Sequence, residues 1–251
     1  MPSPITNCHA PKAHDMSILK PGEVAFAAVA RAQSRVSSRD SGLLIGLDCD
    51  GVLASDRLLW KQLRERFPAD IPARYDDLAS FEWPRATDAT TAHCMALSAD
   101  PSFMGRLAPM PDMTRAIRHL SRRGFRFHVI TARPACVRRA TWRWLHRHGV
   151  GDCIEHITCV ESGLAKVPLA HTLGCIAFVE DNHTTAEAMG ADGIHSYLLD
   201  APYNRMSTRY SRRVRDWSTL VAELSRFAAP KLAVRTFTIA ASVPEAAALA
   251  S

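Results

Sequence analysis

Short hydrophobic runs recur along the chain, and each is followed by a stretch in which apolar residues recur at helical spacing. The runs predict strands at about 43–48, 125–131, 154–158, 175–179 and 194–199. The intervening stretches predict helices at about 112–123, 135–148, 165–173 and 183–190. Strands that alternate with helices indicate an α/β fold built on a doubly wound parallel sheet.

The segment between the first two predicted strands has a different pattern. Residues 55–108 show no strand-like alternation, and helix-like stretches such as 57–67 are interrupted by prolines. We expect this segment to form a small helical cap over one end of the sheet. The predicted division is a core of residues 41–54 and 109–227, a cap of residues 55–108, an N-terminal extension (1–40) and a C-terminal tail (228–251).

Two carboxylates stand where the first predicted strand ends. The string Asp48-Cys49-Asp50-Gly51-Val52-Leu53 follows an apolar run. Side chains two residues apart in a strand lie on the same side, so Asp48 and Asp50 can converge while Cys49 points into the core. Gly51 permits a sharp turn directly after them. A turn alone would require only the glycine, whereas the whole string indicates a phosphoryl-transfer site.

Polar groups also follow the other predicted strands. Thr131-Ala132-Arg133-Pro134 ends the second strand, Lys166 precedes a predicted helix, and Glu180-Asp181-Asn182 ends the fourth strand. Taken singly, each would be an ordinary strand end or helix start. In open α/β sheets, however, ligands bind outside the carboxyl ends of the strands. We therefore expect these groups to meet at one edge.

These four motifs, in this order, resemble those of the haloacid dehalogenase-like hydrolases over about residues 43–205. The resemblance implies a Rossmann-like sheet with strand order 3-2-1-4-5 and a site at the carboxyl end of the first strand. Members that cleave carbon–halogen bonds lack the second aspartate of the first motif. Asp50 therefore disfavours a dehalogenase and favours a phosphatase.

A carboxylate that attacks a phosphate monoester needs a divalent cation and fixed positive groups to offset the repulsion. Hard oxygen ligands favour Mg²⁺. Asp48 and Asp181 are the expected carboxylate ligands, and the resemblance adds the backbone carbonyl of Asp50. Glu180 stands where a second aspartate is more usual, so it either ligates the ion or orients one of its waters.

The remaining expected roles concern the phosphoryl group itself. Asp48 is expected to be the nucleophile that forms an aspartyl-phosphate, and Asp50 the general acid and then the general base. Thr131 is expected to donate a hydrogen bond to the phosphoryl group, and Lys166 to balance the charge of nucleophile and phosphate. The neighbouring Ala132 and Arg133 complete the expected substrate-binding residues.

A later segment narrows the resemblance. Asp200-Ala201-Pro202-Tyr203-Asn204-Arg205, the 131–134 motif and the helical cap together resemble the 5′(3′)-deoxyribonucleotidase branch, which is the cytosolic 5′-nucleotidase type C branch. A plain proline-containing turn is the alternative for this segment. The resemblance implies a nucleoside monophosphate substrate that is contacted by the cap. Phe81, Trp83 and Arg85 are the cap candidates, with simple packing as the alternative for the two aromatic residues.

Composition agrees with this prediction. The chain of 251 residues has 47% hydrophobic residues, enough for one α/β core and a small cap. A formal net charge of +6 favours anionic ligands. Nucleic acid is disfavoured as a partner, because four arginines lie at the helical spacing of a solvated face: Arg138, Arg139, Arg143 and Arg147.

The remaining expectations concern the cellular location, the oligomeric state and the alternative functions. Seven cysteines without a Cys-x-x-Cys pair favour a reducing compartment, and no run of transmembrane length or export leader is found, so we expect a cytoplasmic protein without a membrane partner. A homodimer stays open. The rival functions are a phosphatase for another small phosphate ester or a nucleic-acid end, and a non-catalytic phosphate-binding or interaction protein on the same fold.

Overall fold

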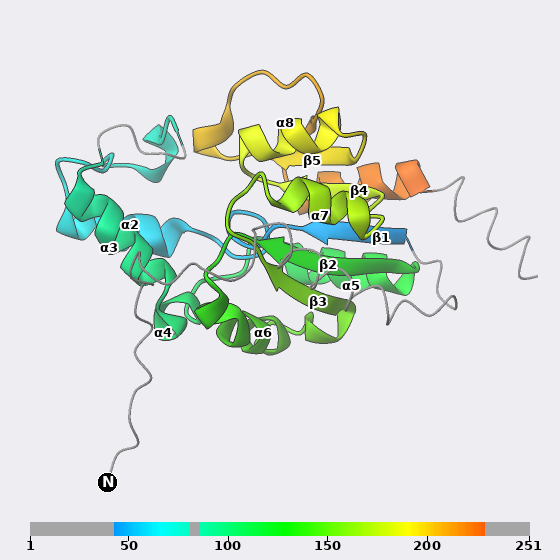
Figure 1. Cartoon of the computed structure of the whole chain (residues 1–251), viewed down its shortest axis with the longest axis horizontal. Helices are drawn as coiled ribbons and strands as arrows, with labels where there is room; N and C mark the ends of the chain where they lie inside the picture. The colour runs from blue at the N-terminus through cyan, green and yellow to red at the C-terminus, as the bar shows by residue number, and fades with distance from the viewer. Residues whose placement is uncertain (1–42, 81–85, 229–251) are drawn as a thin grey trace, which may run out of the picture.

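A parallel sheet of six strands forms the centre of the protein in the computed structural model, which describes residues 43–80 and 86–228. The strand order is β3-β2-β1-β4-β5-β6, and every neighbouring pair is parallel (Figure 1). The strands are β1 (Leu43–Leu47), β2 (Phe125–Thr131), β3 (Ile154–Cys159), β4 (Ala177–Glu180), β5 (His195–Leu199) and β6 (Arg212–Val214). The predicted fold class and the order of the first five strands are confirmed, and β6 is an addition.

Helices connect the strands at nearly the predicted positions. They are α5 (Met113–Arg122), α6 (Arg138–Arg147), α7 (Lys166–Thr172), α8 (His183–Ala191) and a helical segment at 217–228 that was not predicted. The helix predicted at 135–148 begins as a separate 3₁₀ turn, η2 (Ala135–Val137), directly after Pro134. The fixed φ of a proline suits such a helix start.

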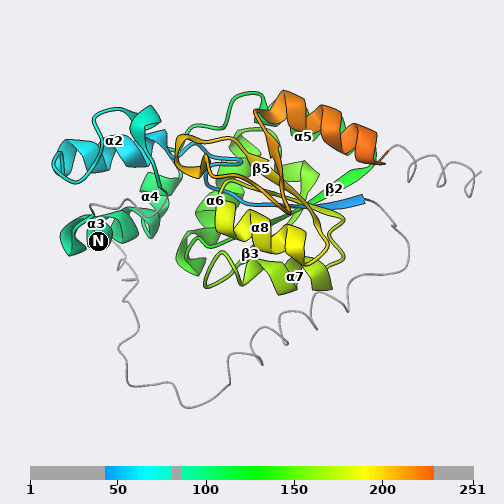
Figure 2. The same ribbon diagram turned by 90° about the horizontal axis from the view of Figure 1, so that it is seen from above.

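Alternate side chains of the strands feed two cores, one on each face of the sheet. Ile45, Phe127 and Val179 pack in the larger core with residues of α5, α6 and the 217–228 helix. Ile130 and Phe178 pack on the other face with residues of α7 and α8. Figure 2 shows α7 and α8 on the side of the sheet opposite the 217–228 helix. Burial on both faces explains why the central strands read as nearly continuous apolar runs.

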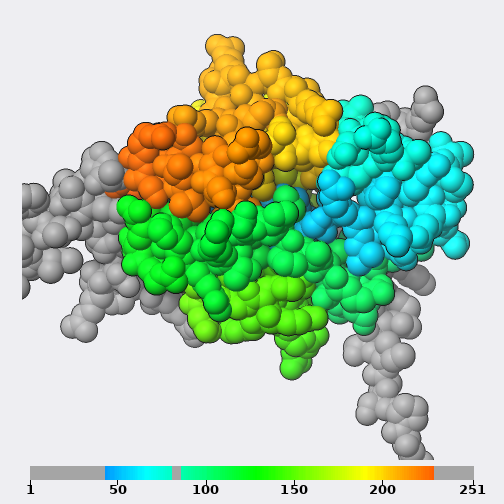
Figure 3. Space-filling view, turned by 180° about the vertical axis from the view of Figure 1, so that it is seen from behind, coloured from blue at the N-terminus to red at the C-terminus, as the bar shows by residue number. Residues whose placement is uncertain are grey.

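Residues 55–108 supply a group of helices at the carboxyl end of the strands (Figure 1). They are α2 (Arg57–Arg66), the 3₁₀ turn η1 (Tyr75–Asp77), α3 (Asp88–Ser98) and α4 (Pro101–Met104). We call this group the cap helices; they gather at one end of the molecule (Figure 3). The helical character predicted for this segment is confirmed for its described residues, whereas the domain boundaries stay a prediction.

Several predictions fall outside the described residues. They concern the extension 1–40, nearly all of the tail 228–251, and Phe81, Trp83 and Arg85. Within the described part of the chain, no helix is both long and apolar enough to cross a membrane.

Candidate active site

The loop after β1 carries the first pair of carboxylates into the site. The backbone N–H of Asp48 donates to the carbonyl of Val179 (3.0 Å), which keeps Asp48 beside the end of β4. The chain then turns at Gly51, whose φ is +71°. A Cβ at this position would lie 2.0 Å from Oδ2 of Asp181, so only glycine allows the close approach of the two segments. The predicted turn at Gly51 is therefore present, and it brings the first and fourth motifs together.

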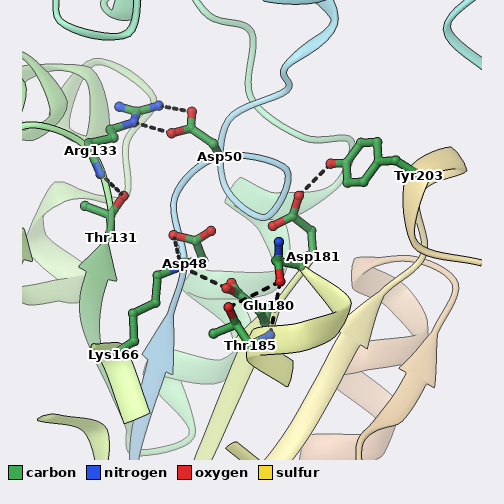
Figure 4. Close-up of polar contacts among 10 residues, drawn as sticks. Asp48, Asp50, Thr131, Arg133, Lys166, Glu180, Asp181, Thr185 and Tyr203 are labelled. Atoms are coloured by element: carbon green, nitrogen blue, oxygen red, sulfur yellow. Dashed lines mark hydrogen bonds and ion pairs between the residues drawn. The ribbon is translucent and has the colours of Figure 1, made fainter. Parts of the chain in front are cut away.

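Three buried carboxylates converge at this edge of the sheet. One oxygen from each of Asp48, Glu180 and Asp181 lies within 4.8 Å of the others. The three side chains come from the ends of β1 and β4, and their residues are at most 7% exposed. Figure 4 shows them around one point, with Lys166 approaching from the side. The sequence predicts Asp48 and Asp181 as metal ligands, and Glu180 as a third ligand or as the group that orients a metal-bound water; the structure brings all three together.

Lys166 is the positive charge within this group. Its Nζ donates to Oδ1 of Asp48 and to Oε1 of Glu180, both at 2.9 Å, and its side chain is 3% exposed. Burial alone would lower the pKa of Lys166, but the charges of Asp48 and Glu180 outweigh it and raise the pKa, so the ammonium stays protonated. One ammonium cannot balance three carboxylates.

This excess of negative charge shifts the pKa values of two of the carboxyl groups. Burial, and then the charge of Asp48, raises the pKa of Glu180 and of Asp181 well above the usual range. Oε2 of Glu180 is buried and has no hydrogen-bond partner. Buried carboxylates in excess, one of them with an unsatisfied oxygen, are the oxygen ligand set that a hard divalent cation requires. The residues present therefore fit a metal ion.

Thr131 completes the ring of groups around Asp48. It ends β2, is 1% exposed, and its Oγ1 accepts from the backbone N–H of Arg133 at 3.2 Å. That bond leaves the hydroxyl proton of Thr131 available as a donor. Figure 4 shows its side chain on the opposite side of Asp48 from Asp181. Ala132 lies exposed in the same loop.

Arg133 does not extend toward the carboxylate group. Its Nε and Nη2 donate to the two carboxylate oxygens of Asp50, at 2.8 and 2.6 Å (Figure 4). Its Nη1 donates to Oγ1 of Thr141 on α6 at 2.9 Å. The guanidinium is thus held from both sides while Asp50 is held by a two-point ion pair. Sequence reasoning named both residues but did not anticipate that they bind each other.

Tyr203 and Asn204 support Asp181 from the 3₁₀ turn η4 (Pro202–Asn204). The hydroxyl of Tyr203 donates to Oδ2 of Asp181 at 2.5 Å. Nδ2 of Asn204 donates to the backbone carbonyls of Asp181 (2.7 Å) and Leu199 (2.8 Å). Burial and the neighbouring charge of Asp181 raise the pKa of Tyr203, so it remains a donor. The Asp200–Arg205 motif marked this segment in the sequence but not these contacts.

A pocket of about 310 Å³ opens between the core and the cap helices. Asp50 and Tyr203 line it from the core. Asp56 and residues of α3 line it from the other side, and the hydroxyl of Tyr75 donates to Asp56. Sequence reasoning did not single out Asp56 or Tyr75, because neither lies in a strand-end motif. The pocket is large enough for a small organic ligand.

The comparison with protein families agrees with this geometry. The family model described as "5′ nucleotidase, deoxy (Pyrimidine), cytosolic type C protein" matches residues 42–226, most of the chain. A search of curated proteins returns no match.

Solved structures share the fold at low sequence identity. Protein Tyrosine Kinase A (PtkA) of Mycobacterium tuberculosis is 20% identical, covers 73% of this chain and 98% of its own, and has a TM-score of 0.55. A mutant of CbbY from Rhodobacter sphaeroides, in complex with xylulose-(1,5)bisphosphate, is 18% identical with coverages of 71% and 96% and a TM-score of 0.50. A haloacid dehalogenase-like family hydrolase from Xanthomonas campestris is 12% identical with coverages of 76% and 98% and a TM-score of 0.50.

Proposed function

The chain belongs to the cytosolic type C family of 5′-deoxynucleotidases and is a phosphatase, and on this basis we propose that it is a Mg²⁺-dependent hydrolase of nucleoside monophosphates. The observation that carries the proposal is the convergence of three buried carboxylates and one buried ammonium at the carboxyl end of β1. A site for phosphoryl transfer needs this combination of a nucleophile, a cation site and a fixed positive charge.

Asp48 and Asp181 would hold the metal ion, together with the backbone carbonyl of Asp50. Glu180 either joins them through its unpartnered Oε2 or orients a bound water. When bound, the ion neutralises phosphate oxygens and so permits approach of an anionic nucleophile. Mg²⁺ is proposed because every candidate ligand is an oxygen atom.

The chain's own residues carry out the transfer in two steps. A carboxylate oxygen of Asp48 attacks phosphorus, and the bond between phosphorus and the ester oxygen breaks. Asp50, whose carboxylate pairs with Arg133, must bind a proton before this step, and it gives that proton to the departing alkoxide. A water then attacks phosphorus of the aspartyl-phosphate while Asp50 takes a proton from it, which returns Asp48 as a carboxylate and releases inorganic phosphate.

Lys166 and Thr131 hold the phosphoryl group during these steps. Lys166 already contacts Asp48, so it lies where the charges of nucleophile and phosphate meet. Thr131 supplies a hydroxyl donor on the other side of Asp48. The proposed role of Arg133 and the adjoining Ala132 in substrate binding is indirect, because the guanidinium of Arg133 pairs with Asp50.

The nucleotide substrate is supported by the family's description and by the pocket beside Asp50. That pocket receives the part of the ester that leaves, and its lining is mainly apolar with a few polar groups, as a base and a sugar require. The family description also supports the proposed cytoplasmic location. The homodimer stays a proposal without a specific supporting contact.

The test is phosphate release from a panel of nucleoside monophosphates, sugar phosphates and 5′- and 3′-phosphorylated DNA ends. Each is measured with Mg²⁺ and with chelator, for the wild type beside Asp48→Asn. We expect Mg²⁺-dependent release from nucleoside monophosphates that Asp48→Asn abolishes while the variant remains folded and binds metal. Phosphate release from the other esters but not from nucleoside monophosphates would contradict the proposed substrate and keep the mechanism. Full turnover in Asp48→Asn would show that Asp48 is not the nucleophile.

A further inference from the structure

The pocket beside Asp50 carries an acidic side chain that the proposed chemistry does not use. Asp56 lines the pocket, and it lies just before α2, the first of the cap helices. The hydroxyl of Tyr75 donates to Oδ1 of Asp56, and Tyr75 itself is 9% exposed. A carboxylate can accept up to four hydrogen bonds, so Asp56, which lines the pocket, can accept further hydrogen bonds besides that from Tyr75.

The charges near Asp56 leave the pocket negative. Among the described residues that line it, none is a lysine, arginine or histidine, and the charged ones are Asp50 and Asp56. Asp50 is balanced by its two-point pair with Arg133. Arg57, the residue after Asp56, lies over the ring of Tyr75 and pairs with Asp76 at 3.6 Å. The carboxylate of Asp56 therefore makes the electrostatic potential in the pocket negative.

Burial raises the pKa of Asp56, and the hydrogen bond from Tyr75 opposes that change. Asp56 is half-buried, so a bound ligand either donates a hydrogen bond to it or leaves it without one, and this difference selects among ligands by their polar groups. A hydroxyl of a sugar or an amino group of a base can donate to it. A second phosphate cannot donate when ionised, and its charge is repelled at short range.

We propose that Asp56 is a specificity-determining residue which admits leaving groups that carry hydrogen-bond donors and rejects leaving groups that carry a second phosphate. The substrate class is thereby narrowed to monophosphates of uncharged, hydroxyl-rich alcohols such as nucleosides. The inference rests on the proposed function for the place of the leaving group, and it extends that function by naming the residue that excludes bisphosphates.

The experiment compares matched esters that differ only in a second phosphate. One pair is deoxyuridine 5′-monophosphate and deoxyuridine 3′,5′-bisphosphate; the other is fructose 6-phosphate and fructose 1,6-bisphosphate. Whichever phosphate is cleaved, the other lies on the leaving group. We expect kcat/KM of the wild type to favour the monophosphate by at least about tenfold within each pair that is turned over, as one short-range charge repulsion predicts.

In Asp56→Asn, which keeps the shape and one acceptor oxygen, we expect this preference to fall by about tenfold or more, chiefly through a lower KM for the bisphosphate. Asp88→Asn is the matched control, since Asp88 is an exposed acid on cap helix α3 that does not line the pocket. It removes the same charge and should leave the preference unchanged. Turnover of p-nitrophenyl phosphate checks that each variant keeps its catalytic core, and Asp56→Ser replaces Asp56→Asn if the latter does not fold.

Two results would overturn the inference: wild-type kcat/KM values within twofold of each other in the pairs that are cleaved, or an unchanged preference in folded Asp56 variants. Failure of the nucleotide proposal looks different. In that case the fructose monophosphate is cleaved and the deoxyuridine esters are not, while the monophosphate preference and its dependence on Asp56 persist within the fructose pair.

Discussion

The ion pair between Asp50 and Arg133 predicts that the two partners differ in how much their removal destabilises the protein. The side chain of Arg133 is 2% exposed, whereas that of Asp50 is 35% exposed. Removing the aspartate therefore strands a buried guanidinium, while removing the arginine leaves a carboxylate that water can still reach. Deletion of one partner of a buried ion pair costs about 3 to 5 kcal/mol. Loss of hydrogen bonds to a partly exposed group costs about 1 to 2 kcal/mol.

We expect Asp50→Ala to lower the free energy of unfolding by about 3 to 5 kcal/mol. Arg133→Met, which keeps the buried stem of the side chain, should lower it by about 1 to 2 kcal/mol. The double variant should lose clearly less than the sum, because the stranded charge is then absent. Urea unfolding at pH 7 measures all three values. A cost for Arg133→Met equal to or above that of Asp50→Ala would refute the reasoning.

Three further predictions concern the surroundings of the site. Tyr203→Phe removes the donor to Asp181 and should weaken metal binding by about 10- to 100-fold, measured by metal titration calorimetry. Gly51→Ala places a Cβ against Asp181 and should lower metal affinity and turnover together. The pKa of Glu187 is lowered to about 2, because hydrogen bonds led by the hydroxyl of Ser211 outweigh the effect of burial. Its contribution to stability should therefore be complete above pH 4.5 and be lost as the pH falls toward 2, and Glu187→Gln should flatten that part of the urea-midpoint profile.

Much of the fold could be predicted from local patterns. The central strands are buried on both faces, so they appear as compact apolar runs that periodicity detects. By contrast, β6 is only three residues long, begins with Arg212 and Arg213, and gains its strand geometry from pairing with β5. The 217–228 helix buries Trp217 and Leu220 against the larger core, a partner that no local pattern reveals.

The candidate site was likewise predictable from the sequence only in part. The sequence by itself determined which groups meet, because Asp48 directly follows a parallel strand, Thr131 and Glu180 each end one, and the carboxyl ends of such strands share one edge. Only the tertiary structure decided how they pair. Arg133 and Asp50 are 83 residues apart, and Tyr203 and Asp181 are 22 apart. Side-chain direction across such separations depends on packing of whole elements, so local sequence cannot specify it.

The pocket of Asp56 shows the same limit most clearly. Its walls come from the loop after β1, from α3 and from η4, and an aspartate before a helix ordinarily indicates only a helix start. The motifs of the sequence predicted which carboxylates and which lysine gather at one edge of the sheet. Only the fold of the cap helices beside the sheet places Asp56 in a pocket with Asp50, because a pocket forms only where separate elements meet.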